Sequence, residues 1–137
     1  MKIVLDTNVL VSGLLSPYQA PGEIVRMSSS GVLSICYDAR ILGEYREVLG
    51  RPKFGFHSAQ IGDLIDQLKA DGTLVTAVPL KEPLPDPHDE MFLEVALAGR
   101  AQWLVTGNLK DYPASKRQGM PVVSPQEMIA LYRQKRT

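Results

Sequence analysis

Residues 1–11, MKIVLDTNVLV, carry the pattern that decides the fold. Four residues of buried-strand character, Lys2 to Leu5, lead into Asp6, and spacing compatible with a helix follows from Thr7. We therefore expect Asp6 at the carboxyl end of a first strand, which is the edge where open α/β sheets bind ligands. Asp6 could instead cap the helix that follows it, a role that aspartate fills well. On this stretch alone, both interpretations stay open.

The rest of the chain repeats this alternation of short β-branched runs and longer stretches with helical spacing. Strands are predicted at residues 2–5, 33–37, 73–78, 103–106 and 122–123. Helices are predicted at residues 7–15, 22–29, 39–49, 58–70, 87–100 and 125–134. Such alternation predicts a parallel sheet that is covered by helices on both faces. The proline-rich segments 16–22 and 79–87 are predicted to be loops, either simple connectors or borders of a substrate cleft.

Length and composition limit the class of protein. A chain of 137 residues with 45% hydrophobic content fits one domain over residues 1–137, without disulfides or a structural metal. Cys36 is the only cysteine, which excludes an internal disulfide and is typical of a reducing cytoplasm. No apolar run approaches the ~20 residues of a membrane span, so we expect a cytoplasmic protein without a membrane segment. The basic end, residues 133–137, is expected to be frayed.

The charge balance excludes a protein that coats DNA. Fifteen Lys and Arg residues match fifteen Asp and Glu residues. Any contact with a nucleic acid must therefore come from a local basic patch. The sequence also lacks a Walker-type phosphate loop and a dinucleotide fingerprint. His57 and His88 are the only histidines, and neither belongs to a set with zinc-like spacing.

Glu44 is a candidate site residue because of its place on a predicted helix. Apolar residues of segment 39–49 form one stripe at helical spacing. At about 100° per residue, Glu44 falls on the flank of this stripe and Glu47 falls nearly opposite it. Glu44 can therefore reach a cleft, whereas Glu47 should face solvent.

Asp89 and Asp111 are the other candidate acids, and each is singled out by its position in a predicted element. Asp89 projects onto the buried face of its predicted helix, one turn before Phe92. Residues 86–89, DPHD, also have the layout of a capping box with Asp86 as the cap, so a capping role and a ligand role stay equally open. Asp111 follows a predicted strand and would share the sheet edge with Asp6.

With these residues in view, the sequence resembles the PIN-domain family, most closely its short stand-alone prokaryotic members that are toxin components of toxin–antitoxin pairs. The resemblance covers nearly the whole chain. It rests on residues 3–10 (IVLDTNVL), 86–96 (DPHDEMFLEVA) and 104–112 (LVTGNLKDY), in this order. It implies a three-layer α/β/α, Rossmann-like sandwich with a mainly parallel sheet of about five strands. The activity that it implies is metal-dependent endonucleolytic cleavage of single-stranded RNA, as the toxin of a type II toxin–antitoxin pair.

The resemblance also implies roles for individual residues. Asp6, Glu44 and Asp89 look like the first three metal-binding acids, and Asp111 looks like the variable fourth. Some members carry Asp where this chain has Asn108, so Asp111 could act through water or only structurally. The supporting polar residues are Asn8, Thr106, Asn108 and Asp86. The expected partners are an RNA substrate, a second copy of the chain in a homodimer, and a small antitoxin whose tail blocks the acidic cleft.

The expected cofactor follows from the chemistry of the acids. Two carboxylates about 4 Å apart repel each other by roughly 4 kcal/mol at an effective dielectric constant near 20, which a shared divalent cation relieves. Ligands that are all oxygen suit Mg²⁺ or Mn²⁺ and argue against zinc. Such an ion would lower the pKa of a bound water and offset charge on the scissile phosphate. Candidates to hold the RNA backbone are Arg40, Arg46, Arg51, Lys53 and Lys110.

Other functions fit the sequence less well. A haloacid-dehalogenase-type phosphatase also begins with an Asp after the first strand, but it requires a second Asp where this chain has Asn8. A phospho-acceptor receiver domain needs its acceptor Asp at the end of a central strand after the second helix, where no candidate stands. The non-enzyme alternative is a catalytically inactive PIN-like module that binds RNA or a protein partner.

Overall fold

The computed structural model describes residues 1–136, and within them five strands form one sheet. The strands are β1 (Lys2–Leu5), β2 (Ser34–Tyr37), β3 (Thr73–Leu74), β4 (Trp103–Val105) and β5 (Val122–Val123). Their order in the sheet is β3-β2-β1-β4-β5, and every pairing is parallel. The predicted parallel sheet is therefore confirmed.

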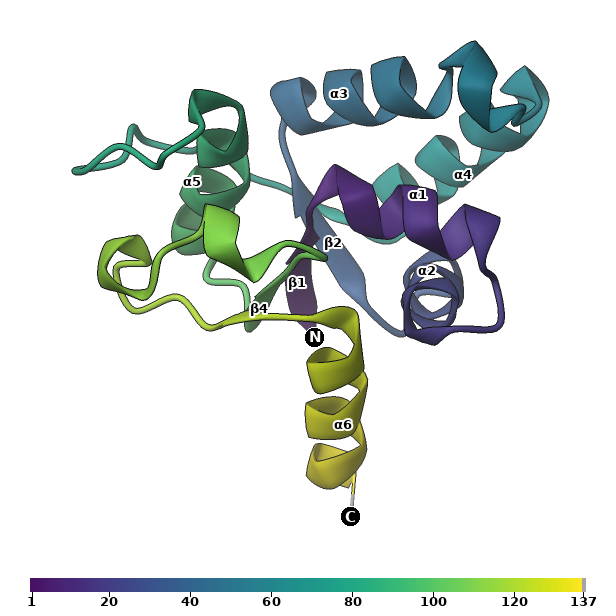
Figure 1. Cartoon of the computed structure of the whole chain (residues 1–137). Coiled ribbons are helices and arrows are strands. Elements are labelled where there is room, and N and C mark those ends of the chain that lie inside the picture. Colours follow the sequence, from purple (N-terminus) through teal and green to yellow (C-terminus); the bar gives the residue numbers. More distant parts are fainter. Residues whose placement is uncertain (137) are drawn as a thin grey trace.

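Helices fill the connections between the strands. They are α1 (Thr7–Leu15), α2 (Ala20–Ser29), α3 (Ala39–Leu49), α4 (Ser58–Asp71), α5 (Glu90–Gly99) and α6 (Pro125–Arg136). Short 3₁₀ turns are η1 (Pro52–Phe54), η2 (Pro87–Asp89), η3 (Leu109–Asp111) and η4 (Ala114–Lys116). In Figure 1, α5 lies to the left of the strands, whereas α1, α2 and α4 lie to their right. This arrangement confirms the predicted α/β/α fold. No helix within residues 1–136 is long and apolar enough to cross a membrane.

The strand order reverses between β1 and β4, in the middle of the sheet. The chain first adds β2 and β3 on one side of β1, and then adds β4 and β5 on the other side. In open α/β sheets, such a reversal opens a crevice at the carboxyl ends of the two strands, and ligands bind there. Leu5 pairs with Val105, and the Asp6 backbone N–H donates to the Val105 carbonyl at 2.9 Å. Asp6 and Thr106 therefore follow neighbouring strands at this crevice.

The core is built around the two central strands. Ile3, Val4 and Leu5 are completely buried, as expected for a parallel strand that is covered on both faces. Tyr45 of α3 is also completely buried, and its hydroxyl donates to the Leu5 carbonyl at 2.5 Å. This bond fixes α3 beside the end of β1. It thereby places Glu44, the preceding residue, near the crevice.

Two predicted elements are shorter than expected by more than one residue. The strand predicted at residues 73–78 ends at Leu74; the Val75 N–H still donates to the Tyr37 carbonyl at 2.9 Å, after which the chain leaves the sheet edge toward Pro79. The helix predicted at residues 87–100 begins with the 3₁₀ turn η2 and becomes α-helical only from Glu90. It ends at Gly99, because Arg100 has a left-handed φ of 53°.

Fraying of the basic end, predicted for residues 133–137, stays a prediction, and the structure shows residues 133–136 as helix. Helix α6 continues to Arg136, and Arg133 donates to both carboxylate oxygens of Glu23 on α2 at 3.3 Å. The Lys135 ammonium lies 5.7 Å from the centroid of the Trp103 ring. These contacts anchor the last turn on α2 and β4. Thr137, the end of the predicted tail, lies outside the described residues.

Candidate acidic site at the sheet edge

Asp6 lies in the crevice as a buried carboxylate that accepts two hydrogen bonds. The residue is only 5% exposed. Its Oδ2 accepts hydrogen bonds from the Tyr112 and Thr106 hydroxyls, both at 3.0 Å. Burial raises the pKa of Asp6, these two bonds lower it, and the charge of Glu44 raises it. The Asp6 side chain makes no capping hydrogen bond to α1, so the capping alternative is not what the structure contains.

Thr106 links Asp6 to the loop that follows β4. The Thr106 hydroxyl oxygen accepts from the Asn8 side-chain amide at 3.5 Å and from the Asn108 backbone N–H at 3.1 Å. The Asn8 Oδ1 accepts from the Gly107 N–H at 2.9 Å. These bonds join the start of α1 to the end of β4. Asn8 and Thr106 therefore hold the position of Asp6, as a supporting role requires.

Asp111 ends the 3₁₀ turn η3 beside this loop. Its Oδ2 accepts from the Asn108 side-chain amide at 2.8 Å. Asn108 thus acts as a donor that orients Asp111. An Asp at position 108 could not donate in this way when ionised.

Glu44 and Glu47 point to different sides of α3. Glu44 is half-buried, and the buried Thr7 hydroxyl donates to its Oε2. The Glu47 side chain is 62% exposed and pairs with Arg51 at 2.8 Å. Helical spacing predicted this division correctly, because the two residues lie nearly opposite each other on the helix.

Asp86, rather than Asp89, caps the turn that precedes α5. The Asp86 Oδ1 accepts from the His88 backbone N–H at 2.9 Å, and this bond and the contact with the His88 ring lower the pKa of Asp86. Asp89 is the residue before α5, but its side chain makes no capping hydrogen bond. The reciprocal bond of a capping box is therefore not formed. Capping does not account for Asp89.

Asp89 has one carboxylate oxygen that lacks a hydrogen-bond partner among the described residues, and it lies within the influence of other carboxylates. Its Oδ2 is buried and has no hydrogen-bond partner within residues 1–136. Burial, together with the negative charges of Asp6, Asp111, Asp86 and Glu44, raises the pKa of Asp89 from 3.8 to about 7. A cation near Asp89 would relieve both the burial cost and the mutual repulsion.

Asp6, Glu44, Asp86 and Asp111 each act on Asp89 through their negative charges, but the described side chains do not form a ready metal cluster. In the part of the chain that the structure describes, no group of three or more His, Cys, Asp or Glu side chains is arranged to hold a metal ion. The convergence of Asp6, Glu44, Asp89 and Asp111 on one cation therefore stays a prediction. Mg²⁺ usually keeps several waters and is bound through one or two carboxylates. An all-oxygen set with the unpartnered Asp89 fits such a hydrated ion.

Sequence reasoning missed two residues that position the acids. Tyr112 is completely buried and donates to Asp6, and burial and the charge of Asp6 raise the pKa of Tyr112, so it stays a neutral donor. Thr7 donates to Glu44 from the first turn of α1. A buried tyrosine usually needs a hydrogen-bond partner, which was the available signal for Tyr112. No comparable signal marked Thr7.

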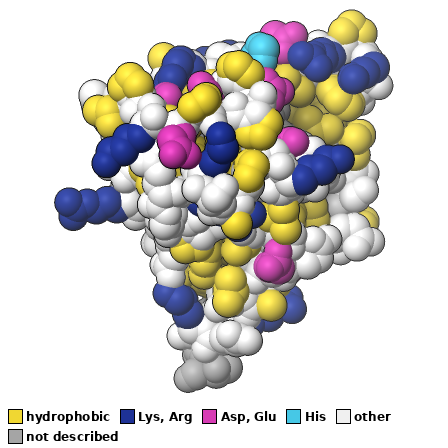
Figure 2. Space-filling view, turned by 60° about the vertical axis from the view of Figure 1, so that its left-hand side comes forward, with side chains coloured by type: hydrophobic (Ala, Val, Ile, Leu, Met, Phe, Trp, Pro, Cys, Tyr) yellow, Lys and Arg dark blue, Asp and Glu magenta, His cyan; other side chains and the backbone are white. Residues whose placement is uncertain are grey.

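The five basic candidates have different surroundings. Arg40 joins α3 to α5, because its guanidinium bonds Asp38 at 2.7 Å and Glu94 at 2.8 Å. Arg51 pairs with Glu47, and the Lys53 ammonium lies 5.1 Å from the centroid of the Phe54 ring. Arg46 and Lys110 are exposed. On the face that Figure 2 shows, Lys and Arg side chains are spread out rather than gathered into one patch.

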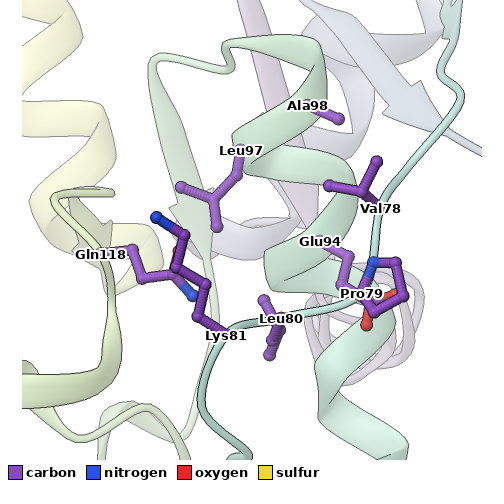
Figure 3. A pocket seen from close by; sticks show the side chains of 8 residues that line it. All are labelled: Val78, Pro79, Leu80, Lys81, Glu94, Leu97, Ala98 and Gln118. Carbon is purple, nitrogen blue, oxygen red and sulfur yellow. The ribbon is translucent and has the colours of Figure 1, made fainter.

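A pocket of about 220 Å³ lies away from these acids, against α5 (Figure 3). The segment after β3 forms one wall with Val78, Pro79, Leu80 and Lys81, α5 contributes Glu94, Leu97 and Ala98, and Gln118 completes the lining. Part of the predicted loop 79–87 therefore borders a pocket. None of Asp6, Glu44, Asp89 and Asp111 lines it.

Comparisons with known proteins give a family and a likeness in fold. A family model described as PIN domain matches residues 2–110, a range that includes Asp6, Glu44 and Asp89 and ends one residue before Asp111. No curated protein matches the chain. A chain in the "Crystal structure of VapBC2 from Rickettsia felis bound to a DNA fragment from their promoter" is 15% identical, with a TM-score of 0.60. The likeness covers 90% of this chain and 98% of that chain, and at this identity it concerns the fold.

Proposed function

This chain belongs to the PIN-domain family, and from that premise we propose that it is a metal-dependent endoribonuclease that cleaves single-stranded RNA. PIN domains are generally nucleases and typically use divalent metal ions. The observation that carries the proposal is the buried, unpartnered Oδ2 of Asp89 among other acids at the carboxyl edge of the sheet. A buried carboxylate without a partner is costly, and it persists where a ligand or function requires it.

Asp6 and Asp89 are the residues that we assign as direct ligands of Mg²⁺ or Mn²⁺. Both are carboxylates, and the all-oxygen set around them suits these hard ions. Glu44 and Asp111 would complete the site directly or through water. When bound, the ion would supply a water of lowered pKa and offset charge on the scissile phosphate.

The polar residues around the acids prepare them for this task. Tyr112 and Thr106 donate to the same oxygen of Asp6, which favours its ionised form and fixes its orientation. Thr7 donates to Glu44 and Asn108 donates to Asp111, and these bonds orient the two carboxylates. When no cation is near, burial and the neighbouring negative charges raise the pKa of Asp89 to about 7, and a bound cation would favour its ionised form.

We further propose that the protein is the toxin of a type II toxin–antitoxin pair and acts in the cytoplasm as a homodimer. The fold that it shares with a chain of the VapBC2 structure is consistent with assembly with a small antitoxin. A basic antitoxin tail would suit a crevice with several carboxylates. Co-expression with the product of a neighbouring short reading frame tests the antitoxin, by copurification and rescue of growth. Light scattering tests the homodimer.

Two other functions are weaker. A haloacid-dehalogenase-type phosphatase needs a second catalytic Asp at position 8, and Asn8 instead donates to Thr106 and accepts from Gly107. A catalytically inactive PIN-like binding module would not need an unpartnered Asp89, which favours the enzyme. Cleavage with added metal separates these possibilities.

The experiment that tests the proposal is a cleavage assay with end-labelled single-stranded RNA of mixed sequence. We expect internal cleavage with Mg²⁺ or Mn²⁺ and none with EDTA, with duplex RNA and p-nitrophenyl phosphate as comparison substrates. Binding of RNA without cleavage under any metal condition would favour the inactive module. Release of p-nitrophenol with intact RNA would favour the phosphatase.

A further inference from the structure

The turn between α3 and α4 presents an aromatic pair beside basic side chains. The rings of Phe54 and Phe56 stack with their centroids 5.7 Å apart and their planes 15° apart. The Lys53 ammonium lies 5.1 Å from the Phe54 centroid. Both phenylalanines are half-buried, whereas Arg51 and Lys53 are exposed. We call Arg51, Lys53, Phe54 and Phe56 the α3–α4 surface.

The backbone of this turn holds the two rings together. Gly55 separates the phenylalanines and has a φ of 69°, a left-handed conformation that favours glycine. Phe56 packs against the hydrophobic core, and Phe54 stacks on Phe56. The ring of Phe54 is therefore supported by a fixed neighbour, which limits the entropy that a further stacking contact would cost.

The segment that carries the aromatic pair is basic, and Glu47 pairs with its Arg51 at 2.8 Å. Residues 48–62 contain Arg51, Lys53 and His57 but no Asp or Glu, in a chain whose acidic and basic residues balance. Such a local excess attracts an anionic ligand. Flat apolar rings beside cations fit a ligand that has both bases and phosphates, which is the composition of a single-stranded nucleic acid.

The α3–α4 surface is connected to the acidic site through α3. Leu49, the last residue of α3, follows Glu44 by five residues, which corresponds to about 8 Å along the helix axis, and the turn with Arg51 begins there. The pKa of Arg51 is raised by its hydrogen bond to Glu47 and, in addition, by the charge of Glu44. Arg51 thus lies within electrostatic reach of Glu44, one of the four candidate acids. A strand of RNA in the crevice could extend along α3 to this turn.

We propose that the α3–α4 surface binds the single-stranded RNA that flanks the cleavage position, with a base stacked on Phe54 and a phosphate held by Lys53. The choice of RNA as the ligand rests on the proposed function. Stacking on an aromatic ring accepts any base, so this surface supplies affinity and a preference for unpaired RNA rather than sequence selectivity. Duplex RNA hides its base faces and would lose the contact.

The test measures RNA binding in EDTA, so that it does not depend on cleavage. Fluorescence anisotropy with a labelled single-stranded RNA should show Phe54→Ala and Phe54→Leu binding on the order of 10-fold more weakly than the parent, with Phe54→Tyr near the parent. Phe54→Leu keeps apolar bulk if the alanine variant is unstable. The matched control is Tyr18→Ala, because Tyr18 is an aromatic residue that is 93% exposed outside this surface. Lys53→Ala should reduce the slope of log K against log[salt] by about 0.7.

Three outcomes would overturn the inference. Parental affinity in both Phe54→Ala and Phe54→Leu would exclude stacking, and an equal loss on duplex RNA would reduce the surface to a general electrostatic contact. A changed oligomeric state with unchanged RNA affinity would make it a protein interface. Parent protein that binds as described but never cleaves RNA with metal would refute the proposed nuclease and leave this inference standing.

Discussion

Replacing Asp89 by asparagine should stabilise the protein when no metal is present. The folded state raises the pKa of Asp89 from 3.8 to about 7, so the ionised carboxylate opposes folding. The penalty is absent below pH 4, grows as the pH rises through the folded pKa, and is complete above about pH 8. The rise in pKa corresponds to about 4 kcal/mol, and partial exposure of the side chain reduces this to about 2 kcal/mol.

Urea denaturation followed by circular dichroism at pH 4, 6 and 8 in EDTA measures this effect. Asp89→Asn should match the parent at pH 4 and exceed its free energy of unfolding by about 2 kcal/mol at pH 8. A metal at 100 times its dissociation constant should raise the free energy of unfolding of the parent by about 2.7 kcal/mol and that of the variant by less. The metal should therefore narrow or reverse the difference in stability between the two proteins. Asp66→Asn, a change of an exposed acid on α4, is the matched control. A variant less stable than the parent at pH 8 in EDTA would refute the reasoning.

Three further substitutions test the surroundings of the site and the packing of the fold. Tyr112→Phe removes the 3.0 Å hydrogen bond to Asp6, so the pKa of Asp6 should rise. Metal affinity, measured by calorimetry, should then fall most at low pH. Unchanged affinity at every pH would count against this role of Tyr112. Gly22→Ala would place a Cβ 2.2 Å from the Pro17 carbonyl oxygen and should lower the free energy of unfolding by at least about 1–3 kcal/mol. The Cβ of Gly62→Ala would meet nothing within 4 Å, so this change in α4 should raise the free energy of unfolding by about 0.5–1 kcal/mol. Equal thermal midpoints for the two glycine variants would contradict this.

The fold could be predicted from local patterns because the decisive features are local. The continuous apolar run from Ile3 to Leu5 is typical of a central parallel strand, and β1 has the predicted bounds. The strand predicted at residues 73–78 was overestimated because β-branched residues favour strand even where the chain leaves the sheet at its edge. The anchored last turn of α6 depends on Glu23, a contact 110 residues away that no local pattern contains.

The candidate site could be predicted in part for the same reason. Helical spacing separated Glu44 from Glu47, and strand ends placed Asp6 and Thr106 together. The partner of each acid could not be predicted, because Tyr112 reaches Asp6 across 106 residues and Thr7 reaches Glu44 across 37. Such pairs are created by the tertiary packing.

The most direct test of the central claim is the rate of metal-dependent RNA cleavage by Asp6→Asn. Under single-turnover conditions with Mn²⁺ or Mg²⁺, the parent and the Asp66→Asn control should cleave single-stranded RNA at similar rates. Asp6→Asn should lose cleavage and keep the parental circular dichroism spectrum, because the change removes a charge and little volume. If purified Asp6→Asn cleaved RNA as fast as the parent, the acidic site at the sheet edge would not be the catalytic centre.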